Sequence, residues 1–177
     1  MGGQNWLVIS WVFYRNDLFK KMTCMLIEQS PDLIESHGLP IPGTIIDKMN
    51  KDRIGYIEQV IDGLHNLLSK TVTGCFRDPT RPLHELCTTS VHGSLTIWMM
   101  KLNILSPKPQ GPYRGLTISR LLSTCRDMQS PYIADQPGFG HAQCRLSCRV
   151  GLVMASIVQP LGFDLDIAEF KSVHPGN

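Results

Sequence analysis

The chain has 177 residues, of which 42% are hydrophobic and 18% charged, and its formal net charge is +2. This length and composition are those of a globular domain with one core, and they exclude a disordered or fibrous protein. The basic residues are scattered along the chain, so they form no field of the kind that holds nucleic acid by its phosphates. The composition therefore predicts a single domain over residues 1–177 and disfavours a nucleic-acid partner.

The first apolar run extends from Trp6 to Tyr14 and is too short to span a bilayer. No basic residue precedes it and no small-residue cleavage site follows it, which excludes a signal peptide. Trp6 also stands where a myristoylation motif beginning at Gly2 would carry Ser or Thr. We therefore expect no membrane association and an intracellular protein of the cytoplasm or nucleus, not a secreted one. In such a reducing compartment the six cysteines would be thiols or metal ligands and not disulfides.

Helical periodicity dominates the chain from end to end. The N-terminal arm, residues 6–40, predicts one or two helices, which Pro31 and the segment "HGLPIPG" interrupt. The clearest pattern follows in residues 45–68, where apolar residues recur at spacings of three and four: Ile54, Ile57, Ile61, Leu64 and Leu68. Further helices are expected over residues 87–105, 116–128, 144–161 and 163–170.

No β-hairpin signal and no internal repeat is found in the sequence. The predicted fold is therefore mostly α, an irregular helical domain whose core lies within residues 41–170. Loops of ten or more residues are expected around 71–86, 106–115 and 129–141. Loops of this length are usually functional, flexible or held in place by something.

Two of these loops carry or adjoin cysteines and histidines. The first brings Cys75, His84 and Cys87, and the second brings three more candidates: His141, Cys144 and Cys148. Together they can supply the four nitrogen and sulfur ligands of a closed tetrahedral zinc site. A metal clip also stabilises most where a loop has no core of its own.

Three interpretations of these residues stay open at this stage. No Cys-x-x-Cys pair is present, so the strongest zinc spacing is missing, and only His84-x-x-Cys87 and His141-x-x-Cys144 remain. The second interpretation is that the cysteines are buried or incidental thiols. The third is a catalytic pair of a cysteine with His141, for which no local signature exists.

Other candidate residues favour structural roles. Cys24 and Cys125 lie among apolar neighbours and are expected to be core thiols, and His65 is expected at the surface or the edge of the core. Asp164 and Asp166 look like solvated charges on a terminal helix. No phosphate-binding glycine loop, Gly-x-Ser-x-Gly or His-Glu-x-x-His motif is found, so no enzyme is predicted.

A fixed order of phrases runs through residues 6–170. They are "ISWVFYRNDLFKKMTCMLI", "LPIPGTIIDKMNKDRIGYIEQVIDGLHNLL", "CTTSVHGSLTIWMMKLNILSPKPQGPYRGLTISRL", "HAQCRLSCRV" and "FDLDIAEF". In this order they resemble the region that follows the BTB/POZ domain in a large group of fungal proteins. Two departures are His92-Gly93 in place of Leu-Gly and Thr88 in place of an acidic residue. The BTB domain expected upstream is missing, so we expect a truncated gene product or a fragment.

The resemblance implies a non-enzymatic adaptor that acts through protein contacts. It also carries over Cys75, Cys87, His141 and Cys144 as the recurring Cys, Cys, His and Cys, with His84 and Cys148 as alternates, which favours a structural zinc ion. It implies neither a particular protein partner nor an oligomeric state.

The residues themselves suggest two alternative functions. The first is a nucleic-acid-binding zinc module that would use the arginines nearest the proposed site: Arg77, Arg81, Arg145 and Arg149. The second, ranked below it, is a thiol enzyme that would use Cys144 or Cys148 with His141.

Overall fold

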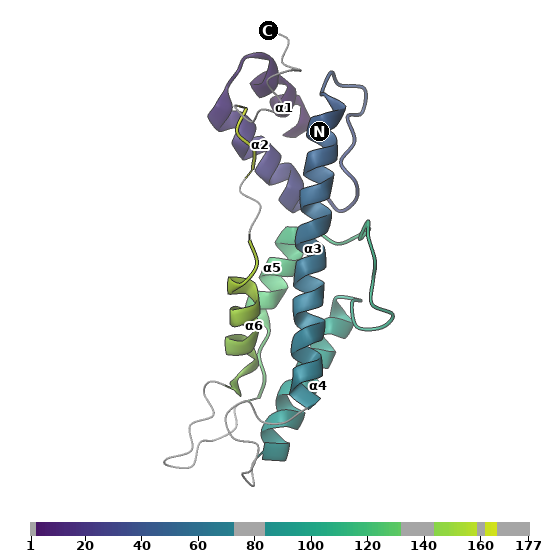
Figure 1. The fold of residues 1–177 in the computed structure, drawn as a ribbon, viewed down its shortest axis with the longest axis vertical. Helices are drawn as coiled ribbons and strands as arrows, with labels where there is room; N and C mark the ends of the chain where they lie inside the picture. Colours follow the sequence, from purple (N-terminus) through teal and green to yellow (C-terminus); the bar gives the residue numbers. More distant parts are fainter. Residues whose placement is uncertain (1–2, 73–83, 132–143, 159–161, 166–177) are drawn as a thin grey trace. The chain divides into compact units, whose positions relative to one another are not determined.

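The computed structural model describes residues 3–72, 84–131, 144–158 and 162–165 (Figure 1). These residues form six helices and no strand: α1 (Gly3–Val12), α2 (Asn16–Gln29), α3 (Gly43–Val72), α4 (His84–Lys101), α5 (Ile118–Asp127) and α6 (Leu146–Ala155). The mostly α fold that the sequence predicts is therefore confirmed for this part of the chain. None of the described helices is both long and apolar enough to cross a membrane.

The helices occur where periodicity predicts them, with differences at their ends. The N-terminal arm contains two helices, and the pattern of residues 45–68 corresponds to α3. The helix expected over residues 144–161 is shorter, because α6 ends at Ala155 and the Ser156 N–H bonds to the Val153 carbonyl at 3.1 Å. The β-branched pair Ile157 and Val158 then disfavours further helix.

The chain divides into two compact units, of which unit 1 holds residues 1–57, 111–119 and 159–177 and unit 2 holds residues 58–110 and 120–158. The helix α3 begins in unit 1 and ends in unit 2. That residues 1–177 form a single domain stays a prediction.

Unit 1 is built around a hairpin of α1 and α2 and the first half of α3. The hairpin closes at residues 13–15, where the Arg15 N–H bonds to the Ser10 carbonyl at 2.9 Å. The rings of Trp11 and Phe19 then meet across it, with centroids 6.0 Å apart. The buried apolar side chains of this unit include Leu7, Ile27, Ile34, Ile45, Met49, Tyr56, Ile57 and Phe163.

A short segment from the end of the chain lies on α2 in unit 1. The Phe163 N–H donates to Thr23 Oγ1 at 3.0 Å, and the Leu165 N–H donates to Asn16 Oδ1 at 2.7 Å. Gly162 has a φ of +77° and sits so close to the Lys20 carbonyl that a Cβ would overlap it. Residues 162–165 are not helical, so the terminal helix expected over residues 163–170 is wrong for its described part. The remainder lies outside the described residues.

Arg53 lies at the centre of unit 1 and is completely buried. Its guanidinium donates only to backbone carbonyls: Nε to Ser30 at 2.9 Å, Nη1 to Pro112 at 2.9 Å, and Nη2 to Tyr113 at 3.1 Å and Leu116 at 2.8 Å. Burial lowers the pKa of Arg53, and the charge of Asp32 acts in the opposite direction. The arginine thus joins α3 to residue 30 and to residues 112–116.

Unit 2 packs the second half of α3 with α4, α5 and α6. Its buried side chains include Val60, Ile61, Leu64, Leu67, Val91, Leu95, Met99, Leu121 and Val150. α6 packs close to α3 at Gly63, where a Cβ would lie 2.5 Å from Val153 Cγ1. A glycine is needed there because a side chain would force the two helices apart.

Candidate functional site

The predicted zinc ligands fall partly inside and partly outside the described residues. Cys75 and His141 lie outside them, and His84 begins α4 with its side chain outside the description. Cys87 and Cys144 are described, and each is 2% exposed. Within the described ranges no group of three or more His, Cys, Asp or Glu side chains is placed to hold a metal ion. The predicted ligand set therefore stays a prediction.

The two described candidates, Cys87 and Cys144, are both buried, as a metal ligand or a core thiol would be. Cys87 stands on α4, Cys144 stands two residues before α6, and α4 and α6 are in contact. Closed structural zinc sites bury their thiolates in this way. Cys148, an alternate ligand, lies instead on the exposed side of α6.

Cys125 and His65 lie at the positions that the sequence predicts for them. Burial raises the pKa of Cys125 to about 11, so this thiol stays protonated near neutral pH, and its predicted place in the core is confirmed. Cys24, expected in the core, is instead only partly buried, and its pKa is raised by burial and by Glu28. His65 lies at the core edge, as predicted, with Nε2 2.8 Å from the Ile104 carbonyl. Because a carbonyl only accepts, Nε2 carries the proton.

The side chain of Asp164 is 47% exposed, as expected of a solvated charge, but it lies on a non-helical segment and forms an ion pair. Its carboxylate lies 3.1 Å from Lys20 Nζ and 3.2 Å from Asn16 Nδ2. These bonds, with that to Lys20 first, hold the pKa of Asp164 below its usual range. The pair fixes the terminal segment to α2. No signal near Asp164 in the sequence identifies these partners, because they lie more than 140 residues away.

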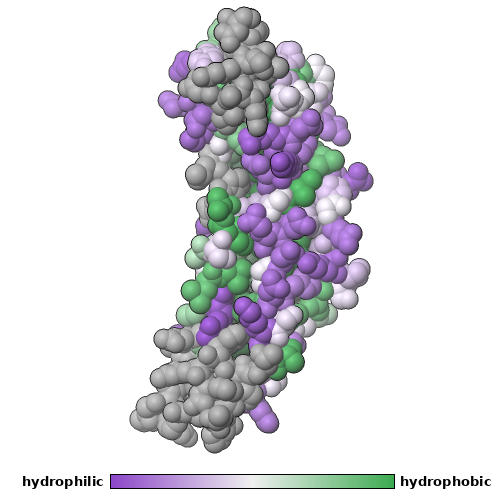
Figure 2. Space-filling model, viewed as in Figure 1, coloured by the Kyte–Doolittle hydropathy of each residue, from purple (hydrophilic) through white to green (hydrophobic). Residues whose placement is uncertain are grey.

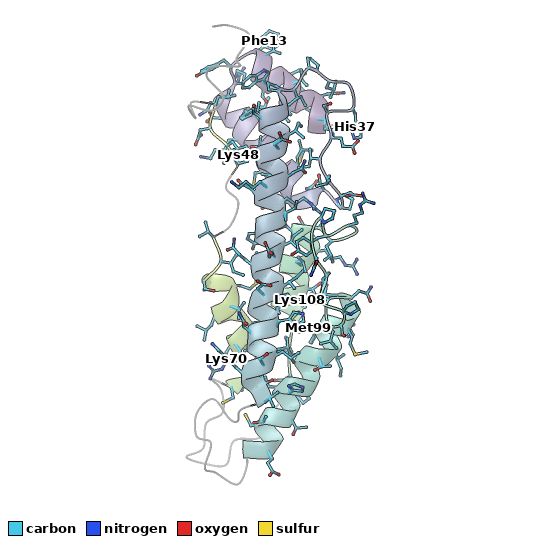
Figure 3. All side chains as sticks on the ribbon, turned by 45° about the vertical axis from the view of Figure 1, so that its right-hand side comes forward. Phe13, His37, Lys48, Lys70, Met99 and Lys108 are labelled. Atoms are coloured by element: carbon cyan, nitrogen blue, oxygen red, sulfur yellow. The ribbon has the colours of Figure 1, made fainter. Side chains whose placement is uncertain are left out.

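The most distinctive surface of unit 1 is the outer side of α1. Four large hydrophobic side chains are exposed there: Trp6 by 53%, Ile9 by 39%, Val12 by 44% and Phe13 by 70%. We call these four residues the α1 outer face. Trp6, Ile9 and Phe13 recur at spacings of three and four, so they share one side of the helix. Figure 3 shows Phe13 at the outer edge of unit 1, just past the end of α1.

The opposite side of α1 is the one that the protein buries. Leu7, Ser10 and Trp11 are at most 2% exposed and pack toward α2. The Ser10 hydroxyl donates to the Leu7 carbonyl at 2.8 Å, so this buried hydroxyl has a hydrogen-bond acceptor. α1 is therefore apolar on both sides but covered on one.

Other exposed hydrophobic side chains in the described ranges are more dispersed. Figure 2 shows hydrophobic surface over α6, where Leu152 is 65% exposed. Ile97 and Met100 are exposed on α4, by 55% and 58%. Neither helix exposes as many large hydrophobic side chains as the α1 outer face.

In the sequence, the apolar run from Trp6 to Tyr14 predicts part of a helix and neither a membrane span nor a signal peptide. The signal for an interaction surface was that this run is apolar on every side of the helix, because such a helix is normally buried on all sides. The contact with α2 provides half of that cover.

No protein-family model, no curated protein and no solved structure matches this chain.

Proposed function

We propose that this chain is a non-enzymatic protein-interaction module, an adaptor that binds its partner through the α1 outer face. One observation carries the proposal: α1 is apolar on both sides, and only one side is buried against the protein. A helix of this composition is normally covered all round. Large contiguous apolar patches on soluble proteins are commonly binding surfaces.

The size of the face fits a reversible contact. With roughly 200 Å² for an aromatic side chain and less for Ile and Val, the four exposed fractions amount to about 400 Å². Covering that area contributes about 10 kcal/mol before costs. Association itself costs on the order of 4–15 kcal/mol, so further contacts at the rim would decide the affinity.

The adaptor role also draws on the resemblance to the region that follows the BTB/POZ domain in fungal proteins. The order of the matching phrases over residues 6–170 and the mostly helical fold support this part of the proposal. In such a protein, the α1 outer face would act beside the BTB domain's own contacts.

A structural zinc ion held by Cys75, Cys87, His141 and Cys144 belongs to the proposal as well. The burial of Cys87 and Cys144 on two elements that pack together supports it. When bound, the ion would join the segment before α4 to the start of α6 and supply no catalytic step. His84 and Cys148 remain the alternate ligands.

The interaction is tested by placing a photo-crosslinking phenylalanine analogue at Phe13 and irradiating the cells that make the protein. We expect protein adducts from position 13 and far fewer from position 97, where Ile97 is also exposed but stands on α4. An equal yield at both positions, or no adduct at position 13, would refute the interaction surface.

The metal is tested by native mass spectrometry of the purified chain with and without a chelator. We expect one zinc ion per chain, lost on chelation together with helical signal. Cys144→Ser should lose the ion, whereas Cys125→Ser, a control at another buried cysteine, should keep it. A metal-free chain with an unchanged fold would refute the zinc site and leave the interaction surface untouched.

A further inference from the structure

We infer that the partner covering the α1 outer face is a second copy of this chain, bound through its own α1 about a two-fold axis beside Ile9. The inference rests on the proposed function and names the partner that the proposed function leaves open.

The area of the face matches one side of a stable dimer. A standard protein interface removes about 800 Å² from each partner, of which roughly 60% is apolar. The α1 outer face exposes about 400 Å² of apolar surface. It therefore supplies most of the apolar area that each chain would contribute, and polar neighbours such as the exposed Asn5 would form the rim.

The charge of the face permits self-association. The sequence carries no charged residue from Gly3 to Tyr14. A two-fold axis brings the same short stretch of both copies together, so a charged residue near the axis would lie close to a charge of the same sign in the second copy. An uncharged stretch pairs with itself without repulsion, whereas an acidic or basic partner would find no complementary charge on it.

The order of side chains along the face reads the same in both directions. An aliphatic residue, Ile9, stands between two aromatic residues, Trp6 and Phe13. The aromatic residues lie about 10 Å apart along the helix axis. In an antiparallel pair with its two-fold axis between positions 9 and 10, Trp6 would lie opposite Phe13 of the second copy, and the two Ile9 side chains would be offset by only about 1.5 Å along the helix axis, close enough to touch. Antiparallel helices also align their dipoles favourably.

A lipid surface is a less suitable partner for this helix. Helices that lie in a membrane interface carry a strongly charged polar face, rich in Lys and Arg. α1 has no charged residue, and its second side is occupied by Leu7 and Trp11 packed toward α2. A protein surface of matching apolar character fits these observations better.

The test is sedimentation equilibrium of the full chain over a wide range of concentration. We expect a monomer–dimer equilibrium in the wild type and a rise of at least about 100-fold in Kd for Ile9→Asp, because two carboxylates would face each other across the axis. The matched control Ile97→Asp changes an exposed isoleucine on α4 and should leave Kd within a few-fold. Circular dichroism shows whether each variant keeps its helices.

A charge-swap experiment distinguishes a second copy from any other partner. Neither Ile9→Asp nor Ile9→Lys chains should dimerise well alone, but a mixture of the two should dimerise more tightly than either. Only a residue that faces its own counterpart gives this rescue. A mixture no tighter than its components would overturn the inference.

The remaining outcomes separate this inference from the proposed function. A wild-type chain that stays monomeric overturns the second copy, while Phe13 adducts to a different protein would leave the interaction role standing. A monomer that gives no Phe13 adducts refutes both. A monomer that sediments with vesicles of phosphatidylcholine and phosphatidylserine, and does not after Phe13→Asp, overturns the second copy in favour of a lipid surface.

Discussion

Replacing Arg53 by methionine should cost unit 1 much of its stability. Methionine keeps a long unbranched apolar stem but removes every donor from a side chain that is 0% exposed. The carbonyls of Ser30, Pro112, Tyr113 and Leu116 would each lose a charged donor at 2.8–3.1 Å. The Tyr113 carbonyl would keep the Leu116 N–H as a donor at 3.2 Å, so the loss falls mainly on the other three carbonyls.

The magnitude follows from these four bonds. A hydrogen bond to a charged group contributes about 1.5–3 kcal/mol, and a buried acceptor left without a donor costs about 1–3 kcal/mol. Water entering the space and the relief of burying a charge offset part of the loss. We therefore expect the free energy of unfolding to fall by about 4 kcal/mol, out of a total on the order of 5–15 kcal/mol. For a chain of this length that lowers Tm by about 10 °C.

Urea and thermal unfolding followed by circular dichroism measure this effect. Arg126→Met, at an exposed arginine on α5, is the matched control and should change stability by less than about 0.5 kcal/mol. Arg53→Lys should recover only part of the loss, because an ammonium group cannot span carbonyls arranged around a planar guanidinium. A loss below about 1 kcal/mol in Arg53→Met would refute the reasoning, since it would mean that the four carbonyls find other donors without cost.

Three further predictions concern other parts of the chain. Gly63→Ala should lower the free energy of unfolding by about 1–2 kcal/mol, because its Cβ would lie 2.5 Å from Val153 Cγ1. Adding Val153→Ala should restore part of this loss. Gly93→Ala, which has open space at its Cβ, should instead raise the free energy of unfolding by up to about 1 kcal/mol. The lowered pKa of Asp164 means that its pairing stabilises the fold above the unfolded pKa of about 3.9, and that this contribution is lost as pH falls through the lower folded pKa. Asp164→Asn should therefore flatten the dependence of Tm on acid pH. An unchanged acid profile would contradict the pairing. Thr23→Val should weaken the attachment of residues 162–165 because Thr23 Oγ1 accepts from the Phe163 N–H at 3.0 Å, which faster amide exchange at Phe163 would reveal and an unchanged rate would contradict.

The sequence predicts the helices well because their signal is local. Apolar residues at spacings of three and four identify α3, and the same pattern places Ile57, Ile61 and Leu64 in the core. The end of α6 is less well predicted, since stopping a helix depends on a balance of small local terms.

The candidate interaction surface was only half predictable. The apolar run from Trp6 to Tyr14 is plain in the sequence, but no pattern says which of its residues the protein buries. Packing against α2 buries Leu7 and Trp11 and leaves Trp6 and Phe13 exposed. The zinc prediction needs residues on two distant segments, of which the structure describes Cys87 and Cys144.

By itself, the sequence determined the helical class and the core positions Ile57, Ile61 and Leu64 of α3, because helix periodicity depends only on neighbours within two turns. The tertiary structure alone decided the partners of Arg53 and Asp164, since their hydrogen bonds join residues 23 to 148 positions apart. No feature of the sequence near Arg53 indicates that its side chain is buried among carbonyls. Such contacts arise only when separate segments fold together, and the same event leaves the α1 outer face exposed.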